Sequence, residues 1–107
     1  MARYLRIGEQ NIIRQMLSNT PEGENICNQL PSLQVEEMDD GGMGSLRFLP
    51  QSTSVKKRLG SILSETEISD IDGTPVSVAF IVDQEGRPFE LDVCKVDFSS
   101  LKRLLGP

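Results

Sequence analysis

Residues 71–96, IDGTPVSVAFIVDQEGRPFELDVCKV, decide the fold of this chain. Two runs rich in β-branched residues are separated by a short polar turn that contains Gly86, and this pattern predicts an antiparallel hairpin. Alternate residues of the first run make both of its faces apolar, with Val76, Val78, Phe80 and Val82 on one face and Ala79 and Ile81 on the other. Such a strand is typical of the centre of a sheet that is covered on both sides.

The second run of the hairpin has one dry and one wet face. Phe89, Leu91 and Val93 point one way, whereas Glu90 and Asp92 point the other way. This hairpin forms part of the scaffold and contains no candidate catalytic group. The functional argument therefore depends on how charged residues are distributed along the chain and on a family resemblance.

The N-terminal third of the chain predicts two helices. Apolar pairs four residues apart favour an amphipathic helix over 9–18 that ends before Pro21. A shorter helix is expected over 22–29, ended by Pro31.

The middle of the chain predicts three strands, over 33–38, 44–49 and 59–69, and Asp97 can cap a last short helix. At 107 residues the chain is expected to be a single domain, 1–107. The predicted fold is α+β: two N-terminal helices packed on one face of an antiparallel β-meander of about five strands, with a short C-terminal helix.

The net charge of −5 is unevenly distributed. Residues 15–46 and 59–86 each contain six acids and no lysine or arginine, whereas the rest of the chain is basic. Such a surface repels nucleic acid and attracts basic protein partners.

The composition excludes several kinds of catalytic site. There is no histidine, so neither a catalytic Ser-His-Asp or Cys-His arrangement nor a histidine-ligated zinc site can form. Cys27 and Cys94 are widely spaced in apolar patterns, which favours buried free thiols, with a disulfide as the alternative. We therefore expect no enzyme activity, no cofactor and no metal site.

No apolar run approaches the roughly 18 residues of a membrane span, and the N-terminus lacks the apolar stretch of a signal peptide. These features predict a cytoplasmic protein that binds no membrane.

Two groups of carboxylates are the candidate site, and their members are Glu36, Glu37, Asp39 and Asp40 in one group and Glu65, Glu67, Asp70 and Asp72 in the other. General acid–base pairs, solvated surface and an acidic docking surface for a basic protein are the three interpretations. The repetition of the charge in two blocks favours a docking surface over an acid–base pair, and plain solvated surface stays open.

Three short patterns resemble a small bacterial domain family of unknown function. They are Asp72-Gly73-x-Pro75-Val76, Glu90-Leu91-Asp92-Val93-x-Lys95-x-Asp97 and Arg3-x-Leu5-x-x-x-Glu9. The resemblance implies an α+β fold and brings no catalytic residues.

The size and acidity of the chain also resemble the immunity proteins of contact-dependent inhibition toxin systems. That likeness implies an inhibitor that neutralises a cognate toxin domain, of a basic, nuclease type, through its acidic surface. The alternative is a small regulatory module that binds a peptide or small ligand in the groove between the helices and the sheet.

Overall fold

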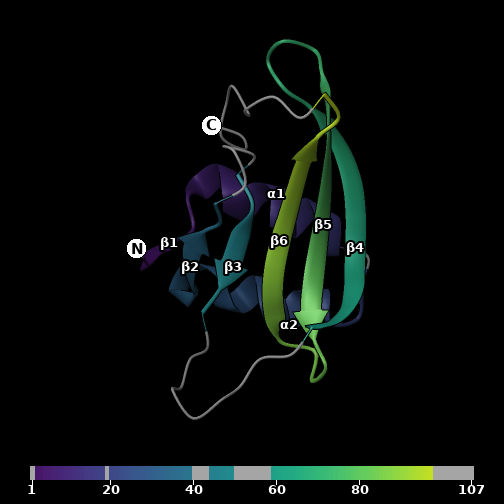
Figure 1. Cartoon of the computed structure of the whole chain (residues 1–107). Coiled ribbons are helices and arrows are strands. Elements are labelled where there is room, and N and C mark those ends of the chain that lie inside the picture. The colour runs from purple at the N-terminus through teal and green to yellow at the C-terminus, as the bar shows by residue number, and fades with distance from the viewer. Residues whose placement is uncertain (1, 19, 40–43, 50–58, 98–107) are drawn as a thin grey trace.

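The computed structural model describes residues 2–18, 20–39, 44–49 and 59–97, which form two α-helices and a six-stranded antiparallel sheet (Figure 1). The elements in chain order are β1 (Ala2–Tyr4), α1 (Ile7–Leu17), α2 (Gly23–Gln29), a 3-10 turn η1 (Leu30–Ser32), β2 (Gln34–Glu37), β3 (Leu46–Phe48), β4 (Leu59–Ser69), β5 (Pro75–Asp83) and β6 (Pro88–Lys95). The α+β class and the two N-terminal helices are as the sequence predicts. No helix in this part of the chain is long and apolar enough to cross a membrane.

The order of the strands differs from a simple meander. The sheet runs β1-β2-β3-β6-β5-β4, so two three-stranded meanders join where β3 pairs with β6, at Leu46 opposite Leu91 and Arg47 opposite Glu90. The expectation of about five strands in one meander is therefore wrong. The alternation of apolar and polar residues predicts which face of the sheet each side chain occupies, but not which strands are neighbours. In the structure, β3 pairs with β6, so that Leu46 extends the buried apolar row of Leu91.

Both helices lie against one face of the sheet (Figure 1). Apolar side chains of α1 and α2 pack on the inward row of β5 and its neighbours, and the rings of Phe48 and Phe80 contact each other at a tilt of 58°, with 5.6 Å between their centroids. The fully buried members of this core include Ile13, Leu30, Val35, Leu46, Val76, Phe80 and Leu91. The side chains of this row hold the helices and the sheet together.

The strand β5 is paired on both edges, as expected of a central strand, but no described helix or strand covers its second face. Val76, Val78 and Phe80 are buried against the helices, whereas Ala79 and Ile81 on the opposite side are only half-buried. We call the sheet side that faces away from α1 and α2 the open face.

The strand β6 faces the core with Leu91, Val93 and Lys95, and Phe89 is not in this row. The register of β5 and β6 shifts between Ile81 and Val82, so that Val82 lies opposite Pro88. This irregularity leaves Phe89 half-buried and corrects the prediction that it shares the face of Leu91.

Other differences lie near the ends of the chain. The strand β1 was not expected, because three residues are too few for an alternating pattern to be read. The predicted C-terminal helix starts at Asp97, which lies in a turn, and the rest of it lies outside the described residues. Cys27 and Cys94 are half-buried free thiols.

Gly23 at the start of α2 yields a prediction about stability. A Cβ atom there would overlap the carbonyl oxygen of Leu17, at the end of α1. Helix propensity alone favours alanine over glycine by about 1 kcal/mol. We nevertheless expect Gly23→Ala to lower the melting temperature, because the two helices would have to separate. The exposed change Asn28→Ala in the same helix is the control and should leave the melting temperature unchanged or slightly raised; a stabilised Gly23→Ala would contradict the packing.

Candidate functional site

Two of the candidate carboxylates, Asp70 and Asp72, contact Lys95, whose side chain is unusual for a lysine because it is fully buried. Its Nζ donates hydrogen bonds of 2.8 Å to Oδ2 of Asp70 and to Oδ2 of Asp72. Asp70 is also buried, whereas the Asp72 side chain is 29% exposed. A buried ammonium group is stable only when carboxylates and hydrogen bonds compensate its lost hydration, so both aspartates serve the fold.

The turn between β4 and β5 brings these two carboxylates to Lys95. The backbone N–H of Asp70 donates to the carbonyl of Thr74, and Gly73 takes the positive φ of 82° that this tight turn requires. The hydrogen bond from Lys95, together with the backbone N–H of Thr74, lowers the pKa of Asp72. The hydrogen bonds to Asp70 and Asp72 raise the pKa of Lys95. Charge is thus retained on Lys95 and Asp72 at neutral pH.

A second buried carboxylate, Glu9, connects α1 to the sheet edge. Arg3 on β1 binds both Glu9 oxygens at 2.8 and 2.9 Å, and its Nε donates to Glu37 at 3.2 Å. The hydrogen bond to Glu9 is the main cause of the raised pKa of Arg3. Glu9 also accepts the backbone N–H of Arg6 and so caps the helix.

At the other end of β5, Asp83 organises the turn into β6. This carboxylate accepts the backbone N–H groups of Glu85 and Arg87 and the Nε of Arg87. Burial alone would raise the pKa of Asp83, but these hydrogen bonds outweigh it and hold the pKa below its ordinary value.

The structure divides the eight candidate carboxylates instead of gathering them. Asp70 and Asp72 bind Lys95, and Glu37 binds Arg3, so these three are used within the fold. Asp39 is exposed beyond β2, and Asp40 lies outside the described residues. The remaining three, Glu36, Glu65 and Glu67, are exposed.

The open face holds these three acids together with two that the sequence did not single out. Strand register places Glu90 beside Arg47 and Ile81, and Asp92 beside Ala79, which itself lies opposite Glu65. The charged side chains on the described part of this face are Glu36, Glu65, Glu67, Glu90, Asp92 and Arg47. Five carboxylates therefore share the face with one guanidinium, whose nitrogen lies 3.7 Å from Glu90.

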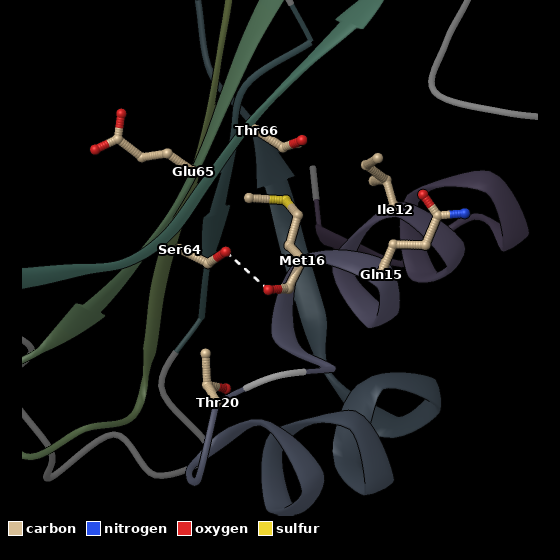
Figure 2. Close-up of a pocket in the computed structure, with 7 residues that line it drawn as sticks. All are labelled: Ile12, Gln15, Met16, Thr20, Ser64, Glu65 and Thr66. Carbon is tan, nitrogen blue, oxygen red and sulfur yellow. Dashed lines mark hydrogen bonds between the residues drawn. The ribbon is translucent and has the colours of Figure 1, made fainter.

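A groove lies on the other side of the sheet, between α1 and the strand β4. Its volume is about 320 Å³, and the lining residues are Ile12, Gln15, Met16, Thr20, Ser64, Glu65 and Thr66 (Figure 2). Ser64 Oγ donates a 2.7 Å hydrogen bond to the carbonyl oxygen of Met16, which ties the end of α1 to the strand. Figure 2 shows Ser64 and Thr66 on the helix side of β4, while the Glu65 carboxylate points away from the groove.

Residues 2–105 match the model of a family described as a domain of unknown function, DUF6984. The chain belongs to this family. No curated protein and no solved structure matches it significantly. Residues that carry the sequence resemblance, among them Arg3, Glu9, Asp72 and Lys95, form the two ion-pair clusters described above. These residues therefore stabilise the scaffold, and the family match gives no support to the likeness to immunity proteins.

Removing the buried ammonium group should destabilise the domain strongly. Lys95→Met removes the ammonium group that binds the Asp70 and Asp72 carboxylates, and we expect the melting temperature to fall by more than about 10 °C. The matched control is Arg47→Met, which removes an exposed ion-pair partner of Glu90 and should lower it by a few degrees at most. A Lys95→Met protein as stable as the wild type would contradict the account.

The same cluster predicts how stability depends on pH. The lowered pKa values of Asp72 and Asp83 give stability that is present above the ordinary value of 3.8 and is lost as the pH falls through their folded values. The raised pKa of Lys95 gives stability that is present below 10.5 and is lost as the pH rises through its higher folded value. The denaturant midpoint should therefore stay constant between these two pH limits. In Lys95→Met the loss of stability at alkaline pH should be smaller, because the contribution of Lys95 is absent. An equal alkaline decline in the variant would show that other groups cause it.

Proposed function

We propose that the protein is a non-catalytic inhibitor that binds a basic protein partner on the open face of its sheet. The observation that supports the proposal is the gathering of five carboxylates and one guanidinium on that face, over β2, β3, β4 and β6. Three of them, Glu36, Glu65 and Glu67, make no ion pair with any described residue.

Strand geometry spreads these charges over a broad, shallow surface. Glu65 and Asp92 lie in one row with Ala79 between them, so their backbones are about 10 Å apart at the usual strand spacing. At physiological ionic strength this distance is close to the screening length of about 8 Å, so the electric fields of these two carboxylates overlap. A surface of this kind attracts a basic partner over a distance and accelerates its association.

An apolar spot lies within the same face. Ile62 and Ile81 are directly opposite one another on β4 and β5, and Ile62 is 53% exposed. Protein interfaces combine a desolvated apolar centre with a charged rim, and the centre supplies most of the affinity. The open face therefore combines an apolar centre that provides affinity with acidic residues that attract a basic partner over a distance.

The specific form of the proposal is an immunity protein whose partner is a toxin domain of the basic, nuclease type. A nuclease binds phosphates with lysine and arginine, and carboxylates on a sheet face complement those same cations. A close complex would keep nucleic acid away from the toxin, which is inhibition without catalysis.

Charge reversal on the open face tests this proposal. Wild-type protein with an affinity tag isolates the partner from its native cell, and the association rate is then measured with purified components. We expect Glu36→Lys with Glu65→Lys to slow association by about tenfold or more and to weaken its dependence on salt, because steering is electrostatic.

The control is Glu22→Lys with Glu24→Lys, which changes the net charge by the same amount on exposed residues at the start of α2. It should slow association far less. Equal effects of the two double variants would show that net charge alone matters and would contradict a binding site on the open face.

The groove between α1 and β4 supports a second candidate, a regulatory module that binds a peptide or small ligand. At about 320 Å³ the groove lies near the lower limit of small-molecule sites, which span roughly 300–1,000 Å³. Its position beside a strand edge favours a peptide over a compact ligand.

A further inference from the structure

The strand β4 combines three features that other parts of the described chain do not combine. It is the longest strand, with 11 residues, it lies at the edge of the sheet, and no described strand pairs with its outer side. Figure 1 shows it as the outermost strand beside β5. An unpaired edge of this length presents a row of backbone N–H and C=O groups to which a further strand can add.

The two sides of this edge have different chemistry. Thr66 and Ile68 lie opposite Val78 and Val76, so they face the helices, and Thr66 lines the groove with Ile12 and Met16. Glu65 and Glu67 are opposite Ala79 and Ser77, so they belong to the open face. A strand that added to β4 would send alternate side chains to the groove and to these carboxylates.

We propose that the edge of β4 binds an extended peptide of the partner protein in which apolar and basic residues alternate. Apolar side chains of the peptide enter the groove beside Ile12 and Met16, and basic side chains lie next to Glu65 and Glu67. Backbone hydrogen bonds to β4 provide affinity, and the alternation provides specificity. The basic half of the assignment rests on the proposed function, whereas the edge and the groove do not.

A second copy of this chain is a poorer occupant. Pairing of two β4 edges would bring Glu65 and Glu67 close to the same residues of the other copy, and like charges on neighbouring strands destabilise the pairing. The same charges protect the free edge from self-association. Basic side chains reverse the sign of this interaction, so complementarity selects a basic peptide.

The test uses a seven-residue synthetic peptide that alternates lysine and valine, capped at both ends, with the full-length protein. Binding is followed by fluorescence anisotropy, and hydrogen exchange of the backbone amides locates the bound peptide. We expect slower exchange within β4 and an affinity that falls by about tenfold or more when every valine is replaced by serine or every lysine by glutamate.

Variants of the protein separate the groove from the open face. Gln15→Trp and Thr66→Phe each fill the groove and should weaken binding by about tenfold or more, whereas Asn28→Trp on the exposed side of α2 is the matched control and should change it less than about twofold. Glu65→Lys with Glu67→Lys should also weaken it by about tenfold or more, and Glu36→Lys should have little effect because Glu36 lies on β2, far along the sheet.

Absence of binding, or binding without protection of β4 and with no response to either groove variant, overturns the inference. A concentration-dependent dimer with protected β4 amides would show that a second copy occupies the edge and would overturn it as well. In either case the proposed function is judged separately, by the effect on the natural partner of Glu36→Lys alone, because Glu36 lies on β2 and not on the edge of β4.

Discussion

The buried ammonium group of Lys95 constrains the three longest strands of this protein. It lies at the end of β6 and reaches the turn between β4 and β5, where Asp70 and Asp72 accept its hydrogen bonds. Burying a charge without such partners would cost several kcal/mol, so the turn must keep the conformation that presents both carboxylates. Asp83 holds the opposite end of β5 by accepting hydrogen bonds from the following turn. The central strand is thus anchored at both ends by buried carboxylates.

This anchoring sorts the acidic residues into two classes. Some bind cations within the fold: Asp70 and Asp72 bind Lys95, and Asp83 binds Arg87. Glu9 and Glu37 both bind Arg3. Of the exposed acids, Glu36, Glu65, Glu67 and Asp92 lie on the open face, and Glu65 and Glu67 also border the edge of β4. The two proposed surfaces meet at Glu65 and Glu67, which belong to both, so one basic partner could extend a strand along the edge and cover the face with its folded body.

The sequence predicted local structure well and the sheet order poorly. Alternation in 75–83 and apolar pairs in 9–18 report burial directly, because a strand repeats every two residues and a helix every 3.6. The pairing of β3 with β6 has no such local signal, since it depends on the fit of Leu46 to Leu91 across a long stretch of chain. The bulge near Val82 likewise keeps Phe89 out of the core row, and the alternation of residues in the sequence does not indicate this bulge.

The candidate site was predictable only in part. Acid-rich blocks correctly indicated exposed carboxylates at Glu36, Glu65 and Glu67, but charge alone could not separate them from Asp70 and Asp72. Lys95 is the residue from which the ion-pair cluster was predictable. It follows Leu91 and Val93 on the inward side of the strand, and a lysine in a buried apolar row needs an acidic partner. Glu90 and Asp92 were already assigned to a wet face, and only the register showed which other acids share it.

The most direct test of the account is to map the natural partner's contact surface on this protein by NMR cross-saturation. The account predicts that saturation reaches the protein at the open face, around Ile62, Glu65, Ile81 and Asp92, and along the edge of β4. Contacts confined to the outer surfaces of α1 and α2, with the sheet untouched, would contradict it.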